Sequence, residues 1–306
     1  MTQPRTLATS TGLASAAPLT DHRAAPRSIW SGRFKRGLLQ SPTGLLGVCL
    51  LTLLILLALF APAISPYDPL DQDLVARLQA PGGGHLLGTD QVGRDVLSRL
   101  LLGARVSLTL GVTASVLGGL IGVSLGLLAG FRGGLVSTLI LRITDAQIAF
   151  PYLVLAIALV AVVGPSLPAL ILILAFFSWV SFARVVAADV ERVRHQEYIL
   201  AARSIGVSER RLAIRHVLPN VLSPVIVIWT FTIAQIVVVE SSLSFLGLGV
   251  QPPTPSWGSM LSDGRAYLEK GWWLSTFAGL AIMLTVVAVN FVGDALRDIL
   301  DPRTRV

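Results

Sequence analysis

Residues 197–220 read EYILAARSIGVSERRLAIRHVLPN and form a charged segment in a chain that is otherwise apolar. The first nine residues of this segment favour a helix, and Gly206 after them suits a left-handed helix C-cap. Ser208 stands at a favourable N-cap position with Glu209 behind it, which predicts a second helix. We therefore expect two short helices that are hinged at Gly206.

The end of this segment and its side chains leave two interpretations open. Leu218-Pro219 is expected to stop the second helix, because a helix usually ends before a proline. Two small residues, Ala201 and Ala202, make the first helix thin, so a groove on another protein could hold it closely. Three arginines could pair with acids on that protein: Arg203, Arg210 and Arg211. The alternative is a solvated basic loop that touches no partner.

The composition of the whole chain indicates a membrane protein. Of its 306 residues 53% are hydrophobic and only 13% are charged, whereas soluble domains carry about 25% charged residues. The net charge of +7 would also suit a nucleic-acid-binding protein. The basic residues lie beside long apolar runs instead of forming one basic face, so nucleic acid is not an expected partner. The single cysteine, Cys49, says nothing about the redox compartment.

Six segments are long and apolar enough to span a membrane, which takes about 20 residues. The uncharged run 146–183 is too long for one span and is divided by the turn-forming residues 164–168. The expected spans are roughly 44–64, 105–130, 137–162, 168–186, 221–243 and 274–294. About 40 residues precede the first span, which favours a retained anchor helix over a signal peptide. The predicted fold class is an all-α membrane protein with six transmembrane helices.

Basic residues set the expected orientation, because cytoplasmic loops collect Lys and Arg. Residues 1–43 carry six basic residues and one acid, which places the N-terminus in the cytoplasm. Six spans return the C-terminus to the same side, so both termini and the loop 187–220 are expected to be cytoplasmic. Residues 1–29 are rich in Ala, Ser, Thr and Pro and are expected to form a disordered tail. Residues 297–306 are expected to form a second cytoplasmic tail.

Two kinds of residue stand out within the spans. Four glycines at four-residue spacing form a smooth stripe for close helix packing, within this chain or against a second subunit: Gly118, Gly122, Gly126 and Gly130. Glu240 lies near the outer end of the fifth span, where a structural role and a pathway role both stay open. Arg142 and Asp145 share one helix face near the inner end of the third span. We interpret them as an interfacial salt bridge, with a place in the pathway or gate as the alternative.

Several function classes lack their sequence signatures. The chain contains no G-x-x-x-x-G-K-[ST] phosphate loop, no H-E-x-x-H zinc motif and no nucleophile elbow. We therefore expect neither an enzyme nor a cofactor or metal site in this chain. An ion-coupled secondary transporter would be expected to carry midplane carboxylates or broken half-helices, and the sequence shows little of either. Energy for transport is then expected to come from another chain.

Three motifs and an N-terminal stretch resemble one family, the ABC importer permeases. Residues 197–220 resemble the EAA motif of that family. The matching positions stand at the family's spacing: Ala201, Ala202, Gly206, Leu218 and Pro219. Residues 85–108, HLLGTDQVGRDVLSRLLLGARVSL, and 240–261, ESSLSFLGLGVQPPTPSWGSML, resemble segments of the C-type permeases of dipeptide, oligopeptide and nickel importers. Residues 30–73 resemble the N-terminal region of the same permeases, and the likeness extends over 30–301.

Two positions depart from the general EAA motif. Leu200 stands where the family often has Glu, which puts in doubt any polar contact made by that Glu. Glu197, one turn earlier, is a hypothetical substitute. His216 stands where the general motif has Ile, and a His at this place looks typical of the peptide subgroup.

The resemblance implies a type I importer permease (MetI-like) fold in the inner membrane of a bacterium. It implies five core helices within 103–296 and an additional N-terminal helix within 30–84. The implied partners are a homologous B-type permease, two cytoplasmic ATPase subunits that bind ATP and Mg, and an extracytoplasmic binding protein. The outer loop with Trp257, Trp272 and Trp273 would lie at the outer interface. The implied substrate is a di- or oligopeptide, with a nickel chelate or another small solute as the alternative.

The resemblance also implies a coupling role for the opening segment. Its first helix, around 197–205, would sit in a groove of an ATPase subunit and transmit movement to the pore. The residues implied for this contact are Glu197, Leu200, Ala201, Ala202, Arg203, Gly206, Glu209, His216, Leu218 and Pro219.

Overall fold

The computed structural model describes residues 41–300, which are helices joined by loops. This range contains no β-strand and only two isolated bridges, Gly82 with His85 and Thr89 with Asp95. The predicted tail over 1–29 and the last residues of the predicted tail over 297–306 lie outside the described residues.

Five described helices are long and apolar enough to cross a membrane: α2 (Pro42–Ile64), α3 (Val96–Arg132), α6 (Leu167–Arg194), α9 (Leu218–Phe245) and α11 (Trp272–Leu300). The shorter helices are α4 (Gly134–Ile148), α5 (Tyr152–Val163), α7 (Glu197–Ser204), α8 (Glu209–Leu212) and α10 (Trp257–Gly264). If α4 and α5 are counted together as one bent span, the described residues hold six spans. The predicted all-α membrane fold is confirmed.

The third span is broken, and the prediction of one continuous helix over 137–162 is wrong. α4 and α5 meet at an angle of 89° across residues 149–151. Pro151 accounts for the break, because its ring removes a backbone donor and pushes Phe150 out of the helical conformation. The expectation that this chain shows little sign of broken half-helices is therefore corrected.

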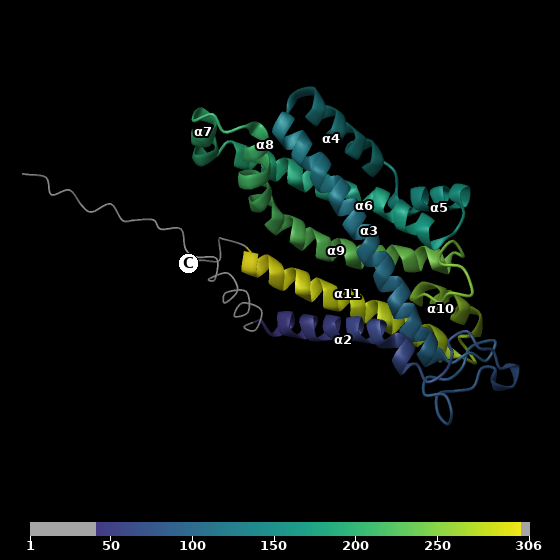
Figure 1. Ribbon diagram of the computed structural model, residues 1–306. Coiled ribbons are helices and arrows are strands. Elements are labelled where there is room, and N and C mark those ends of the chain that lie inside the picture. Colours follow the sequence, from purple (N-terminus) through teal and green to yellow (C-terminus); the bar gives the residue numbers. More distant parts are fainter. Residues whose placement is uncertain (1–40, 301–306) are drawn as a thin grey trace, which may run out of the picture.

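The pair α3 and α6 forms the centre of the bundle, and α3 crosses the molecule beside α6 (Figure 1). The glycine stripe of α3 lies against α6 within the same chain. A Cβ atom added at Gly122 would lie 2.6 Å from Cβ of Phe182, and one at Gly126 would lie 2.6 Å from the carbonyl oxygen of Ala183. The absence of side chains on the stripe is what lets the two backbones approach this closely.

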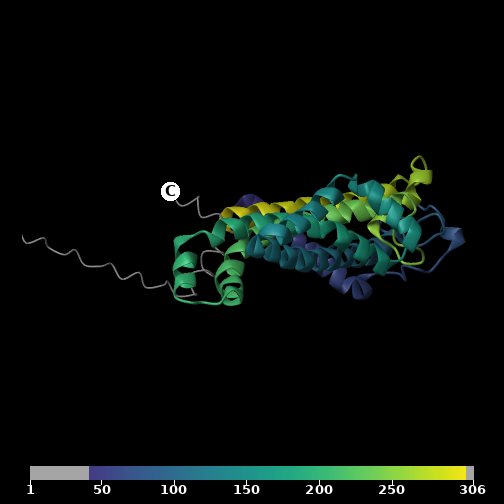
Figure 2. The ribbon, with the colours of Figure 1, turned by 90° about the horizontal axis from the view of Figure 1, so that it is seen from above.

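The loops gather at two opposite ends of the bundle. α2 and α11 run side by side along one edge, with α9 next to α11 (Figure 1). α7 and α8 project from one end, while α10 and the loop 65–95 cover the other end (Figures 1 and 2). Since the long helices connect these ends, the charged segment 197–220 and the outer-loop motifs lie on opposite sides of the spanning layer.

Candidate functional site

The charged segment forms two short helices joined at Gly206, as predicted. The N–H of Gly206 donates to the carbonyl of Arg203 at 3.0 Å, and the N–H of Val207 donates to the carbonyl of Ala202 at 3.2 Å. These two bonds make a Schellman motif. Gly206 has φ of +83°, a left-handed conformation that costs other L-residues about 1–2 kcal/mol. A Cβ there would meet none of the described residues within 4 Å, so the backbone, and not crowding, requires the glycine.

An ion pair bridges the two helices across this hinge. Nε and Nη2 of Arg203 lie 2.7 Å and 3.0 Å from the two carboxylate oxygens of Glu209. Both side chains are exposed, so the pair contributes less than about 1 kcal/mol to folding stability. Its bidentate geometry instead fixes the angle between α7 and α8. The acid that faces Arg203 here belongs to the same chain. Ser208 occupies the predicted N-cap position, although its side chain accepts no hydrogen bond from the described backbone.

The predicted helix stop at Leu218-Pro219 is wrong. Both residues lie in the first turn of α9, and the chain is helical without a gap from α8 onward. A π-helical turn, Ala213–Val217, connects the two helices. The π turn changes the backbone hydrogen-bond pattern before α9 begins. Pro219 therefore lies in the first turn of α9, where the missing backbone N–H of a proline costs no helical hydrogen bond. Nδ2 of Asn220 donates to the carbonyl of His216 at 2.5 Å and so satisfies an acceptor of the π turn.

One face of α7 is anchored and the other is exposed. Ile199 is fully buried in a cluster with Val186 and Val190 of α6. The exposed side chains of α7 and its cap include four apolar ones: Tyr198, Leu200, Ala201 and Ile205. Ile205 is 82% exposed. Neighbouring apolar side chains in this number on one face are typical of a surface that another protein covers.

The polar groups around this face include a neutral tyrosine hydroxyl, a half-buried histidine and an exposed carboxylate. Partial burial raises the pKa of Tyr198 further above neutral pH, so its hydroxyl is uncharged. Nδ2 of Asn220 donates to that hydroxyl at 3.2 Å. Glu197 is exposed in the first turn of α7, and His216 is half-buried. The charge of Glu197 is thus available to a partner from the same side as Leu200.

Glu240 is fully buried where α9 meets α10. Its Oε1 accepts hydrogen bonds from the hydroxyls of Ser244 at 2.7 Å and Ser256 at 2.9 Å. Ser256 is also the N-cap of α10 and accepts from the N–H of Ser259 at 3.1 Å. Oε2 of Glu240 has no hydrogen-bond partner among the described residues. These contacts join a helix to a loop, which favours the structural role over the pathway role.

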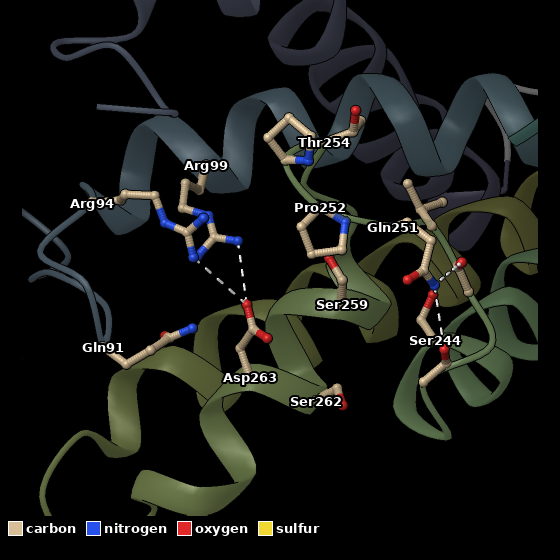
Figure 3. A pocket seen from close by; sticks show the side chains of 14 residues that line it. Gln91, Arg94, Arg99, Ser244, Gln251, Pro252, Thr254, Ser259, Ser262 and Asp263 are labelled. Atoms are coloured by element: carbon tan, nitrogen blue, oxygen red, sulfur yellow. Dashed lines mark hydrogen bonds and ion pairs between the residues drawn. The ribbon is translucent and has the colours of Figure 1, made fainter. Parts of the chain in front are cut away.

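A buried ion-pair network lies at the end of the bundle opposite α7. Asp90 accepts from Nε of Arg94 at 2.6 Å and from a guanidinium nitrogen of Arg99. Nη2 of Arg99 lies 3.3 Å from Asp263 of α10. Figure 3 shows Arg94 and Arg99 pointing toward Asp263 beside a cavity of about 200 Å³. The network joins the loop before α3 to α10. The only sequence signal for it was the mixture of acids and arginines within 85–108.

Two of the three tryptophans of the outer loop are buried. Nε1 of Trp257 donates to the carbonyl of Leu100 at 3.0 Å, and Nε1 of Trp273 donates to the carbonyl of Thr89 at 3.1 Å. Trp272 is exposed. Trp257 and Trp273 therefore hold this layer together, and only Trp272 lies at the surface where all three were expected.

The predicted salt bridge between Arg142 and Asp145 is wrong, because Asp145 is paired with another helix. Its Oδ1 lies 2.8 Å from Nη1 of Arg184 on α6, and Arg142 is exposed on α4. The pair lies close to the break of the third span, beside a cavity of about 350 Å³ that Arg184 helps to line.

In the described part of the chain no cluster of three or more His, Cys, Asp or Glu side chains could hold a metal ion.

Two family models match this chain. Binding-protein-dependent transport system inner membrane component matches residues 122–306. N-terminal TM domain of oligopeptide transport permease C matches residues 28–81. A solved structure of the inward-facing MetNI methionine ABC transporter is similar with a TM-score of 0.55 over 66% of this chain and 96% of that chain. At 19% identity this likeness shows the fold alone.

Curated relatives cover most of the chain. The dipeptide transport system permease protein DppC of Escherichia coli K12 is 46% identical over 265 residues, which is 85% of this chain and 88% of the relative. The di/tripeptide transport system permease protein DppC of Pseudomonas aeruginosa is 41% identical with the same coverage. A putative peptide transport system permease protein of Brucella suis is 41% identical over 89% of this chain and 91% of the relative. This chain therefore belongs to the family of binding-protein-dependent transport system inner membrane components, as a multi-pass permease of the inner membrane.

Proposed function

We propose that this chain is the C-type permease subunit of an ATP-driven importer of di- or oligopeptides. The observation that carries the proposal is the unit of α7, Gly206 and α8. It is anchored to α6 on one face and exposes apolar side chains on the other. The peptide class is supported by the relatives, which are named as peptide permeases.

The exposed face of α7 is proposed to dock into a groove of an ATPase subunit that binds ATP and Mg. Ala201 lies at the centre of this face and lets the groove approach the helix closely. Leu200 then makes an apolar contact, and Glu197 supplies the acid that the usual motif has at the position of Leu200. Arg210 and Arg211 are exposed and match acidic side chains at the rim of that groove. Gly206 and the pair of Arg203 with Glu209 keep α7 and α8 at a fixed angle.

The proposed orientation places α7, α8 and both termini in the cytoplasm, in line with the arginines of this segment. The opposite end, with α10 and Trp272, then faces the extracytoplasmic binding protein. A homologous B-type permease completes the pore and presents its own coupling helix to a second ATPase subunit. In this arrangement the chain supplies half of the pathway and none of the ATPase site.

The proposed cycle is an equilibrium between two pore states that nucleotide biases. ATP binding closes the ATPase pair, draws the two coupling helices together and opens the pore toward the binding protein. The peptide enters, and hydrolysis returns the pore to its inward-facing state. Nucleotide drives the change only because it binds the two states with different affinity.

The test is reconstitution of this permease with its B-type partner, two ATPase chains and the binding protein in proteoliposomes. We expect ATP-dependent accumulation of a labelled dipeptide, and none when the ATPase chains are left out. Uptake by this chain alone, driven by an ion gradient, would show a secondary transporter instead. Assembly without uptake of either a peptide or a nickel chelate would refute a transport role, and uptake of the chelate alone would refute the peptide class.

A further inference from the structure

The break of the third span exposes irregular backbone at membrane depth. The side chain of Gln147, next to the break, donates to the carbonyl of Phe176 at 3.0 Å and accepts from Nε1 of Trp179 at 3.1 Å. Phe176 and Trp179 lie 9 and 12 positions after the start of α6, which is roughly 15 Å along the helix at 1.5 Å per residue. That is about half of a hydrocarbon core of about 30 Å.

Irregular backbone at this depth does not face lipid. Non-helical segments within a membrane are tolerated only where they are buried in protein or line a water-filled cavity. Residues 149–151 are all exposed in this chain, and Phe150 is 60% exposed. The break must therefore face either another protein chain or an aqueous path.

A cavity of about 350 Å³ opens beside the break and favours the aqueous path. Polar side chains from α5, α6 and α9 reach its wall: Tyr152, Ser178, Ser181, Arg184, Thr232 and Gln235. Ser181, Arg184 and Gln235 are exposed. Gln147 has both ends of its amide occupied by α6, so it fixes the wall in place. These hydroxyl, amide and guanidinium groups stand among apolar side chains such as Phe150, Phe177 and Ile236, and they offer a hydrated solute hydrogen-bond partners that lipid would leave unused.

Arg184 on the cavity wall forms an ion pair with Asp145 of α4, which is not itself one of the lining residues, and this pair retains binding capacity. Nη1 of Arg184 and Oδ1 of Asp145 lie 2.8 Å apart, and the two side chains are 48% and 49% exposed. This contact uses one nitrogen of the guanidinium and one oxygen of the carboxylate. The other edge of Arg184 can hold a carboxylate, and the second oxygen of Asp145 can accept from an ammonium group. Ionisable residues within membrane spans commonly mark a substrate pathway.

We propose that this cavity is this subunit's share of the translocation pathway, where Arg184 contacts the carboxylate end of a passing peptide and Asp145 its ammonium end. The inference rests on the proposed function and adds to it the residues that meet the substrate. An extended dipeptide spans about 7 Å. It can therefore lie alongside the ion pair with its carboxylate next to Arg184 and its ammonium group next to Asp145. Because Arg184 and Asp145 remain paired with each other, the peptide is held weakly, as a transport pathway requires.

The location of the cavity can be tested by thiol labelling in the assembled transporter. Cys49→Ser provides the background, and Ser181→Cys places a thiol on the cavity wall. Leu172→Cys is the control, because nine residues along a helix put it on the opposite face of α6. A charged, membrane-impermeant thiol reagent is expected to label Ser181→Cys and to spare Leu172→Cys. Absence of labelling at Ser181→Cys would overturn the assignment of this cavity to the pathway.

The charge contact can be tested with the double variant Arg184→Gln and Asp145→Asn, whose amides can still hydrogen-bond to each other. The number of dipeptides imported per ATP hydrolysed is expected to fall on the order of tenfold, the size of one lost charged hydrogen bond. ATP hydrolysis stimulated by the binding protein is expected to remain. An unchanged ratio would overturn the proposed contact, and so would parallel loss of hydrolysis in a fully assembled complex. Failure of the proposed function is distinguishable, because the wild-type transporter would then import no dipeptide at all.

Discussion

Replacement of Gly206 separates the backbone requirement of the α7–α8 hinge from every side-chain effect. Gly206 has φ of +83°, and a Cβ there meets no described atom within 4 Å. The cost of a substitution is therefore conformational only. Alanine is expected to cost about 1–2 kcal/mol, and valine more, because its branched Cβ fits a left-handed residue worse. Asparagine is expected to cost least, since it visits this conformation most readily.

This cost acts on the ordered hinge directly. A loss of one or two kcal/mol changes the ratio of ordered to disordered hinge by a factor of about 5–30. The hydrogen bonds from Gly206 and Val207 and the ion pair of Arg203 with Glu209 are then all weakened together. If α7 couples ATP hydrolysis to the pore, the disordered fraction cannot transmit movement.

The assay is the number of peptides imported per ATP hydrolysed at equal amounts of assembled transporter. We expect this ratio to decrease in the order glycine, asparagine, alanine, valine at position 206. Gly247 is the matched control: it has φ of +79°, closes a similar motif at the end of α9, and lies at the opposite end of the bundle. Gly247→Ala carries a comparable backbone cost and is expected to leave the ratio unchanged. Normal coupling by Gly206→Val, or an effect of asparagine as large as that of valine, would refute this reasoning.

Three further predictions concern stability, each measured by thermal unfolding of the purified permease. Gly122→Ala is expected to destabilise the fold by roughly 1–3 kcal/mol through overpacking. Gly119→Ala is the control: its nearest added contact is 3.5 Å, so it is expected to cost nothing or to stabilise the helix by up to about 1 kcal/mol. Equal losses in the two variants would contradict the packing of α3 on α6. Asp90→Asn is expected to cost about 3–5 kcal/mol, because it removes the buried carboxylate that Arg94 and Arg99 share and leaves them only the more distant Asp263. Asp263→Asn at the partly exposed rim is expected to cost no more than about 1 kcal/mol. Glu240→Leu leaves the buried hydroxyls of Ser244 and Ser256 without their acceptor and is expected to cost about 1–3 kcal/mol for each hydroxyl. Glu240→Gln keeps an acceptor oxygen and is expected to cost less. A larger loss of stability in Glu240→Gln than in Glu240→Leu would contradict the structural role.

Features that depend on local sequence were predictable. The six spans followed from uncharged runs, because a helix that crosses a membrane needs about 20 consecutive, mostly apolar residues. The hinge followed from one glycine between two helical stretches, because only glycine adopts that backbone cheaply. The ends of the helices were less accurate. α3 begins at Val96 and not near 105, since Asp95 caps it and the arginines of its first turns were assigned to a loop.

Features that depend on contacts between distant segments were not predictable. Pro62 and Pro224 lie inside α2 and α9 without ending them, while Pro151 breaks the third span. A proline in a membrane helix is tolerated when neighbouring groups satisfy the freed backbone, so the sequence alone does not say which of the three breaks its helix. The partner of Asp145 shows the same limit. Spacing pointed to a residue three positions away, and the actual partner is Arg184, 39 positions away on another helix.

The packing around α7 determines where a movement imposed there would go. Ile199 is buried against Val186 and Val190, so α7 is attached to the end of α6. Nη1 of Arg194 donates to the carbonyls of Gly130 and Phe131 at 3.0 Å and 3.3 Å, which joins that end of α6 to the end of α3.

The glycine stripe brings the backbones of α3 and α6 into close contact. Because close-packed surfaces transmit strain, a force on one of these helices moves the other with it. An ATPase that moves α7 would therefore move α6 and α3 as one body. Arg184 lies on α6 ten residues before its end, about 15 Å away, and would move with that body. Its partner Asp145 lies on α4, which contacts α6 through the amide of Gln147 and through a buried cluster of Ile140 with Trp179 and Val180. A displacement that the ATPases impose on α7 would thus reach Arg184 in the cavity wall, which connects the state of the nucleotide to the side chain proposed to contact the peptide.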